Sequence, residues 1–259
     1  MSQPMTRRQW LGGAAAAGAT FTIVPRHVLG GANHTAPNDK LALAGIGLGG
    51  IGKAVYHPWN FRGWWDFGTG SLGDMGCHHA NTPFRALRLT HPVSVSAMST
   101  KAMAETAPLA SIVTYEFPAR EDMPPLRVVW YDGGLKPLSP RPGFPLGGSG
   151  EMYIGDEGFM IGPRVYPEER AKKFADVPRT LPRRPGNYRE WFEACRGGEP
   201  AGSHFPVAGL LTEFVLLGNI AIRTGKRLEW DGTAGQFAND AAANQLLHDE
   251  YREGWSLEG

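Results

Sequence analysis

Residues 62–79 read RGWWDFGTGSLGDMGCHH and hold two adjacent tryptophans, a glycine-rich turn and an Asp74-x-x-x-His78 pair. If the chain is helical from Ser71 onward, Asp74 and His78 lie four residues apart on one face of the helix. A carboxylate next to an imidazole can transfer a proton near neutral pH, so the pair is a candidate catalytic site. The alternative is a structural Asp–His pair, which forms a polar helix end above a tryptophan-rich core.

The composition is that of a folded protein with no strong charge. Of the 259 residues, 42% are hydrophobic and 20% are charged, and the formal net charge is +1. Because neither sign of charge predominates, we expect no nucleic acid and no anionic membrane surface among the partners. The 35 glycines and 21 prolines indicate many tight loops within a folded chain.

The two cysteines, Cys77 and Cys195, are too few to form a zinc cluster by themselves. A metal site that combines Cys77 with His78 and His79 is an alternative, but adjacent residues of a helix point to different faces. We therefore predict no metal site. In an exported protein the two cysteines could also form a disulfide, and the sequence does not decide this.

Residues 1–32 have the features of a twin-arginine (Tat) export signal. Arg7 and Arg8 precede a short run rich in glycine and alanine, GGAAAAGATFTIVP. This run is too short and too weakly apolar for a transmembrane helix. We expect cleavage near Ala32, a periplasmic or otherwise exported protein, and no membrane span in the mature chain.

Residues 40–54, KLALAGIGLGGIGKA, predict a short apolar strand followed by a dinucleotide-binding loop. In such a loop the glycines permit a tight turn, a close approach of the backbone to a pyrophosphate, and packing of the next helix on the strand. A glycine-rich loop without a ligand is the alternative. The predicted cofactor-binding residues are Gly45, Ile46, Gly47, Leu48 and Gly50, and the predicted cofactor is NAD or NADP.

The context of this loop departs from a complete Rossmann domain. Pro58 opposes a continuing helix, and Asp66, 16 residues after Gly50, lies in a loop rather than at the end of a strand. We therefore predict a truncated Rossmann βα start over residues 40–54, joined directly to one domain over residues 55–259.

The remaining chain predicts an α/β fold, in which an open, largely antiparallel or mixed sheet is flanked by helices. Residues 165–185 are expected to be irregular. Four helices are expected. The first covers residues 71–89 and is kinked at Pro83, and the second is short and begins at Asn187, whose spacing to Glu190 is that of a capping box. The third covers residues 206–223, which are apolar and buried, and the fourth covers residues 239–252. The expected strands cover residues 93–97, 111–117, 126–131 and 228–230, with a hairpin over 151–163 that turns at 155–158.

These motifs together resemble the Gfo/Idh/MocA oxidoreductases, in particular their exported bacterial branch. The resemblance rests on the export signal running into VPRHVLGG, on the strand with GIGLGG, on RGWWDFGTGSLGDMGCH, and on the block over residues 187–231. It covers the first fifty residues and nearly everything from Tyr56 onward. Members of this family join a Rossmann domain to an α/β domain whose open sheet often mediates oligomerisation. The resemblance therefore implies a homo-oligomer formed through the C-terminal sheet.

The resemblance also implies a site. Asp74 and His78 match the family's Asp-x-x-x-His pair near the nicotinamide. His78 would act as general acid or base on a sugar or polyol hydroxyl while hydride passes to NAD or NADP, and Asp74 would bind substrate or orient the imidazole. Because indole faces stack on sugar CH groups and arginine binds hydroxyls, the expected substrate contacts are Arg62, Trp64, Trp65 and His79. Core packing is the alternative for the tryptophans.

One expected catalytic group has no counterpart. The family places a lysine in a Glu-Lys-Pro segment late in its Rossmann domain, and neither Lys40 nor Lys53 fits that position. We therefore expect the oxidoreductase activity to be impaired by the truncated cofactor domain, and two other functions stay open. One is a non-catalytic sugar-binding or oligomer-forming module, and the other is a non-redox lyase or hydrolase of glycosides that uses Asp74, His78 and His79.

Overall fold

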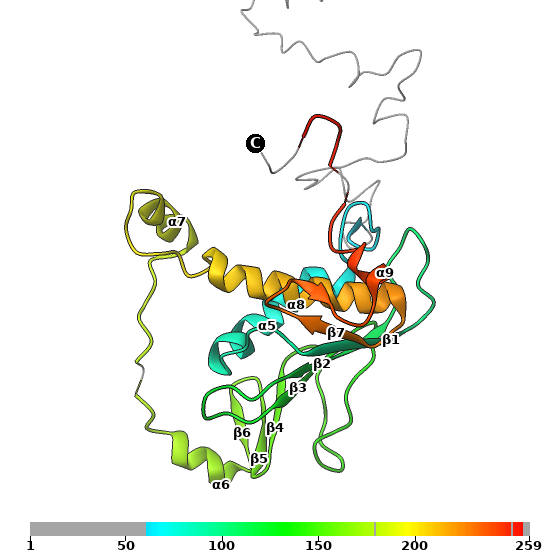
Figure 1. Cartoon of the computed structure of the whole chain (residues 1–259). Helices are drawn as coiled ribbons and strands as arrows, with labels where there is room; N and C mark the ends of the chain where they lie inside the picture. The colour runs from blue at the N-terminus through cyan, green and yellow to red at the C-terminus, as the bar shows by residue number, and fades with distance from the viewer. Residues whose placement is uncertain (1–60, 179, 250, 256–259) are drawn as a thin grey trace, which may run out of the picture. The chain divides into compact units, whose positions relative to one another are not determined.

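The computed structural model describes residues 61–178, 180–249 and 251–255, all within the unit Gly50–Gly259 (Figure 1). The predicted export signal over 1–32 and the predicted Rossmann start over 40–54 lie outside the described residues. The same holds for the predicted cofactor-binding residues, which are Gly45, Ile46, Gly47, Leu48 and Gly50.

The larger sheet has five strands, each antiparallel to its neighbours, in the order β3–β2–β1–β7–β8. Along β2, buried residues alternate with partly exposed ones, as expected for a strand with one covered face. Val113, Tyr115 and Phe117 lie on the covered side. The strand bounds are Leu126–Tyr131 (β3), Ser111–Phe117 (β2), Ser94–Ser99 (β1), Leu228–Asp231 (β7) and Gln236–Phe237 (β8).

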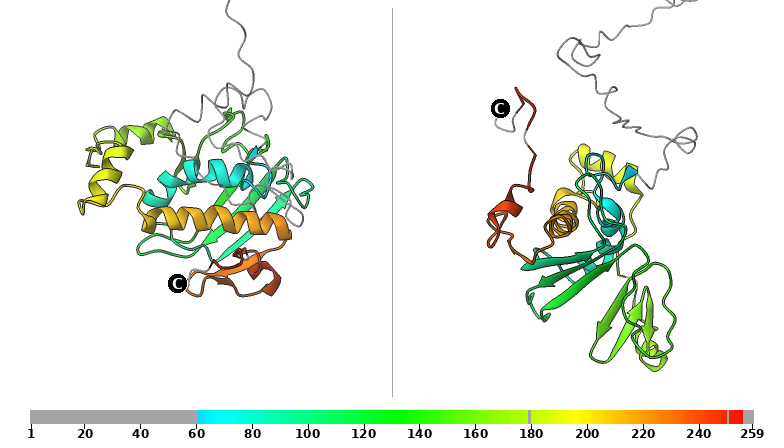
Figure 2. Two further views of the ribbon diagram at one scale, coloured as in Figure 1. Left: turned by 90° about the horizontal axis from the view of Figure 1, so that it is seen from above. Right: turned by 90° about the vertical axis from the view of Figure 1, so that its right-hand side faces the viewer.

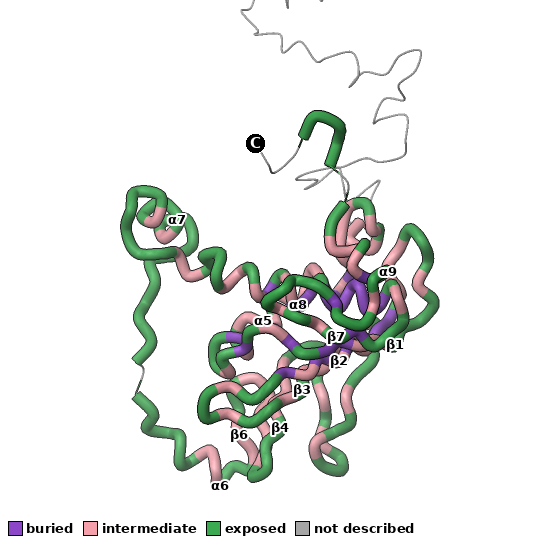
Figure 3. Tube along the Cα trace, viewed as in Figure 1, coloured by how far each residue is buried: buried purple, intermediate pink, exposed green. Residues whose placement is uncertain are grey.

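Two long helices, α5 (Gly70–Ala86) and α8 (Phe205–Thr224), cover this face of the sheet (Figures 1 and 2). Phe214 of α8 lies at the centre of the core, with its ring centroid 4.0 Å from that of Tyr115 and 5.2 Å from that of Phe84. Most of the buried residues belong to these two helices and to the strands beneath them (Figure 3). The hydrophobic contact between helices and sheet therefore holds this part of the chain together.

The predicted apolar helix over residues 206–223 is confirmed as α8, which ends at Gly225 in left-handed backbone with φ of 64°. By length and composition alone, α8 could cross a membrane. Half of its most apolar stretch is buried inside the protein, against α5, β1 and β2. A core helix packs in this way, so the apolar composition of α8 is explained by its place in the fold.

A second, three-stranded antiparallel sheet has the order β4–β5–β6. None of its strand residues is buried, and an aromatic group formed by Phe144, Phe159 and Tyr166 packs on it. The predicted hairpin is confirmed as β4 and β5. The expectation that residues 165–185 are irregular was wrong for residues 165–174, whereas the described residues from 175 to 185 have no helix or strand. Tyr166 stacks on Phe159 and so adds a third strand to the hairpin. The bounds here are Met152–Gly155 (β4), Gly158–Ile161 (β5), Arg164–Tyr166 (β6), Glu168–Ala171 (α6) and Lys172–Phe174 (η2).

The helix predicted from Asn187 is present as α7 (Asn187–Cys195), but it has no capping box. The N-cap residue is Gly186, and the Glu190 carboxylate accepts a hydrogen bond from the backbone N–H of Gly202 at 2.6 Å. Glu190 therefore connects α7 to the segment that precedes α8. The capping-box spacing had predicted instead a bond from Glu190 to the start of its own helix.

The predicted closing helix over residues 239–252 was wrong in its length. Only α9 (Ala241–Asn244) forms, capped by the Asp240 carboxylate, which accepts hydrogen bonds from the backbone N–H groups of Ala242 and Ala243. The side chain of Asn244 exchanges two hydrogen bonds with the backbone of Phe237 in β8. These bonds tie α9 to the edge of the sheet.

The predicted class, α/β with a largely antiparallel sheet flanked by helices, is confirmed for the described residues. The strands predicted over 111–117 and 126–131 coincide with β2 and β3. The helix predicted over 71–89 is α5, which ends at Ala86 and keeps Pro83 within it.

Candidate functional site

A folded-back loop brings Arg62 to the helix that carries the candidate catalytic pair. The backbone N–H of Gly70 donates to the carbonyl of Arg62 at 2.8 Å, and Gly70 has a φ of 67°. A side chain at Gly68 would come within 2.6 Å of the Arg62 backbone, so the turn requires glycine there. The turn places the Arg62 guanidinium on Asp74, with 2.5 Å between Nη1 and Oδ2. The glycine-rich composition of residues 62–70 is thus explained by this close turn.

The two sides of α5 differ in burial. Leu72, Ala80 and Phe84 are buried in the core, whereas Asp74 is partly exposed and His78 is exposed. Gly76 lies between α5 and α8, where a Cβ atom would stand 2.9 Å from the Val215 side chain. The helix therefore keeps its small and apolar side against α8 and leaves the predicted catalytic side open to solvent.

Two hydrogen bonds fix Asp74, one at its carboxylate and one at its backbone carbonyl, whereas among the described residues none fixes the His78 side chain. The Asp74 carboxylate accepts the bond from Arg62, and its backbone carbonyl accepts one from the Cys77 thiol at 3.3 Å. Within the described residues no hydrogen bond joins Asp74 to His78. Because the Asp74 side chain is 42% exposed, its ion pair orients the carboxylate more than it stabilises the fold.

The two tryptophans occupy different environments. Trp64 is 47% exposed, and its backbone bridges to Thr106. Trp65 is partly buried, and its ring lies 5.6 Å from the Arg223 guanidinium of α8. Trp64 has the more accessible indole, whereas Trp65 packs between the loop and α8.

His79, predicted as a substrate contact, is bonded to two residues that the sequence analysis missed. Its Nδ1 lies 2.5 Å from Oε1 of Glu151, and its Nε2 lies 3.3 Å from Oγ of Ser149. The ring of Trp130 lies beside the imidazole, with 6.2 Å between centroids. Glu151 stands 72 residues after His79, and no local pattern of the sequence connects the two.

The charge of Glu151 also acts on Tyr153, which lies two residues further along the chain. Partial burial raises the pKa of Tyr153, and the Glu151 carboxylate raises it further. Glu151 therefore faces a histidine and a tyrosine from the start of β4.

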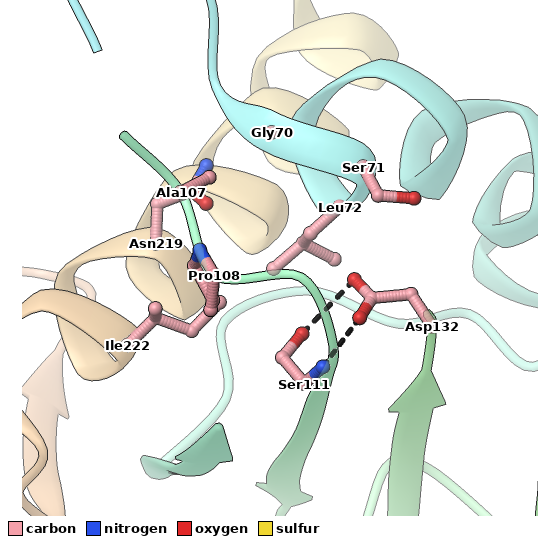
Figure 4. A pocket seen from close by; sticks show the side chains of 9 residues that line it. All are labelled: Gly70, Ser71, Leu72, Ala107, Pro108, Ser111, Asp132, Asn219 and Ile222. Atoms are coloured by element: carbon pink, nitrogen blue, oxygen red, sulfur yellow. Dashed lines mark hydrogen bonds between the residues drawn. The ribbon is translucent and has the colours of Figure 1, made fainter. Parts of the chain in front are cut away.

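A small cavity lies between the start of α5, the start of β2 and the C-terminal part of α8 (Figure 4). In it the Asp132 carboxylate accepts hydrogen bonds from the backbone N–H and the hydroxyl of Ser111 and from the indole of Trp130. The Asn219 amide nitrogen is buried here without a hydrogen-bond partner among the described residues. The volume open to the centre of a water molecule is about 10 Å³, which is roughly enough for one water. It is therefore too small to hold a sugar.

Neither cysteine forms a disulfide; Cys77 is partly buried and Cys195 is exposed. Among the described residues, no group of three His, Cys, Asp or Glu side chains is arranged to hold a metal ion. The alternative of a site formed by Cys77, His78 and His79 thus has no support in the geometry.

The structure brings together Arg62 with Asp74, and His79 with Glu151 and Ser149. No hydrogen bond recorded between the described residues joins one group to the other. No protein-family model and no curated protein matches this chain.

Proposed function

We propose that residues 61–255 belong to the substrate-binding part of a Gfo/Idh/MocA-type oxidoreductase that acts on a hydroxyl of a sugar, glycoside or polyol. The observation that carries the proposal is the open side of α5, where exposed His78 stands one turn after Asp74 and Arg62 fixes the Asp74 carboxylate. A histidine that is reachable by a ligand and close to an oriented carboxylate is suited to proton transfer.

In the proposed reaction, the substrate hydroxyl lies against the open side of α5. The imidazole of His78 removes the hydroxyl proton, and the Asp74 carboxylate binds a neighbouring hydroxyl or orients the imidazole. Arg62 limits the movement of Asp74. The exposed indole of Trp64 offers a flat apolar surface for a sugar ring, and Trp65 and His79 contribute less because each already has a partner.

The chemistry that NAD or NADP would supply, when bound, is acceptance of the hydride from the carbon that carries the hydroxyl. The residues proposed to hold the pyrophosphate are Gly45, Ile46, Gly47, Leu48 and Gly50, which lie outside the described residues. The proposal includes export through the twin-arginine pathway, on the strength of residues 1–32.

A non-catalytic sugar-binding module is the second candidate. The exposed indole of Trp64 and the ordered Arg62–Asp74 pair would serve binding equally well without hydride transfer. This candidate needs no complete Rossmann domain and no catalytic lysine.

We also propose self-association through the face of the five-stranded sheet that α5 and α8 leave uncovered. Met98, Ile112 and Tyr131 are aligned across β1, β2 and β3 on that face, and Met98 is 69% exposed. A row of apolar side chains across three strands is suited to packing against a second copy.

The experiment mixes the purified full chain with NAD or NADP and a panel of monosaccharides, glycosides and polyols, and follows reduced cofactor by its absorbance. We expect turnover of at least one substrate. We expect the His78→Ala variant to lower kcat by about 10²- to 10⁴-fold with a small change in KM. The reason is that the imidazole accepts the proton in the transition state and contributes little to substrate binding.

His248→Ala is the matched control, because His248 is also exposed and takes no part in the proposed site. If neither cofactor changes the melting temperature at millimolar concentration, the oxidoreductase proposal is wrong. If a sugar binds, Trp64→Ala weakens it and no turnover occurs, the second candidate is correct instead.

A further inference from the structure

Ser149, His79 and Glu151 are arranged in the order hydroxyl, imidazole, carboxylate. The Ser149 Oγ lies 3.3 Å from Nε2 of His79, and the Glu151 Oε1 lies 2.5 Å from Nδ1. Each ring nitrogen thus has one partner, and the two partners are of different chemical kinds. A carboxylate only accepts, so the proton on the imidazole resides at Nδ1, and Nε2 is left to accept from the serine hydroxyl.

The chain produces this order through a local feature. Ser149 and Glu151 are two residues apart, and Gly150 between them has a φ of 141°, a conformation that residues with a side chain rarely adopt. Both side chains reach the same imidazole. His79 itself stands on α5, and the Trp130 ring lies beside it.

The surroundings of Ser149 leave it accessible. Ser149 and its neighbours Gly148 and Gly150 are exposed, and a Cβ atom at either glycine would meet nothing within 4 Å. In the described part of the chain the backbone N–H groups of Ser149 and Gly150 make no hydrogen bond. In α/β-hydrolases the N–H of the residue after the nucleophile contributes to the oxyanion hole, and Gly150 holds that position here.

We propose that Ser149, His79 and Glu151 form a nucleophile–base–acid triad that cleaves small carboxylic esters. Because Ser149 lies on an open surface, a substrate is selected by how easily its ester carbonyl reaches the serine and by how reactive the ester bond is. An ester with a small acyl group is therefore a sufficient substrate. The proposed oxidoreductase relies on Asp74 and His78 for its chemistry, and the two proposals share only His79, which is a minor substrate contact in the first and the base in the second.

The reaction has two balanced steps without net redox change. Ser149 Oγ forms a bond to the carbonyl carbon while its proton moves to Nε2 of His79. The bond between that carbon and the alcohol oxygen then breaks, and the alcohol leaves with the proton. Water attacks the acyl-serine in the same way, which releases the carboxylic acid and restores Ser149. Glu151 keeps the imidazole in the required tautomer and stabilises its charged form.

The test treats the full chain with a fluorophosphonate reagent, locates the label by mass spectrometry, and measures hydrolysis of p-nitrophenyl acetate. We expect one label, on Ser149, and a burst of about one p-nitrophenol per chain.

The variants Ser149→Ala, His79→Gln and Glu151→Gln separate the roles. We expect Ser149→Ala to abolish labelling, and His79→Gln to slow it by about 10²-fold or more. Glu151→Gln keeps the size of the side chain and should slow the reaction while circular dichroism stays unchanged. Ser203→Ala is the matched control, because Ser203 is exposed beside His204 and makes no hydrogen bond to it.

Two outcomes would overturn the inference. One is a folded protein in which Ser149 stays unlabelled at high reagent concentration. The other is labelling of Ser149 at an unchanged rate in both His79→Gln and Glu151→Gln, which would show an exposed serine without an activating base. Neither outcome bears on cofactor binding or on His78, so the oxidoreductase proposal is tested separately.

Discussion

The five-stranded sheet and the three-stranded sheet are stabilised in different ways. The first buries Val113, Tyr115 and Phe117 under α5 and α8. The second has no buried strand residue and is held by an aromatic group around Phe159 and by an ion pair between Glu157 and Arg170. Both are antiparallel and both contain short strands, so the difference lies in whether helices cover them.

The difference matters for the candidate sites, because each depends on a different layer. Asp74 and His78 stand on α5, whose other side is part of the buried core. Glu151 directly precedes β4, and its bond to His79 connects the weakly covered sheet to the well-covered layer. We therefore expect the open side of α5 to keep its geometry when the smaller sheet opens, whereas the Ser149–His79–Glu151 arrangement would be lost.

The largest effect is expected for Phe214→Ala in α8. Phe214 is buried and contacts the rings of Phe84, Tyr115 and Phe117, so the variant leaves a cavity in the core. We expect the free energy of unfolding to fall by about 3–5 kcal/mol, measured by urea denaturation. The exposed Phe205→Ala variant, on the same helix, is the control and should change it little. A loss below about 1 kcal/mol would mean that the layer of α5, α8 and sheet is not the main source of stability.

A smaller and local effect is expected for Phe159→Ala in β5. The variant removes stacking on Tyr166 and the edge contact with Phe144. We expect a loss of about 1 kcal/mol, with faster amide hydrogen exchange in β4, β5 and β6 and unchanged exchange in α8. Exchange that rises equally in both sheets would show that they unfold as one unit, and the distinction drawn between them would fail.

The smallest effect on stability is expected for Met98→Lys on the uncovered face of the larger sheet. Because Met98 is mostly exposed, the free energy of unfolding of a single copy should change by less than about 0.5 kcal/mol. If a second copy covers that face, light scattering should show a multimer of the original chain and a lower mass for the variant. A monomeric original chain at all concentrations would contradict self-association through the sheet.

The parts of the fold that follow local periodicity could be predicted. Alternation marks β2, and the apolar run with Gly225 after it marks α8 and its end. Long-range contacts decided the rest. The third strand β6 carries Tyr166, which stacks on Phe159, and α9 ends at Asn244, whose side chain bonds to β8. Neither interaction leaves a repeating pattern in the sequence.

The candidate sites also differ in how far they could be predicted from local sequence patterns. The spacing of four residues placed Asp74 and His78 on one side of a helix, and α5 confirms the helix, but among the described residues no hydrogen bond joins the two. The bond between His79 and Glu151 could not be predicted, since it spans 72 residues and depends on where the loop before β4 lies. The bond between Arg62 and Asp74 required the tight turn at Gly68 and Gly70, which only the folded chain displays.

The close approach of α8 to its neighbours at Gly218 has a consequence for how this protein can change. A Cβ atom at Gly218 would collide with the Tyr115 hydroxyl, which is buried and has no hydrogen-bond partner among the described residues. Together with Gly76, this glycine leaves α5, α8 and the sheet no room to slide past one another. Substitutions on the outer, solvent-exposed side of α5 can therefore be accommodated more readily than a tilt of α5 or α8 against the sheet.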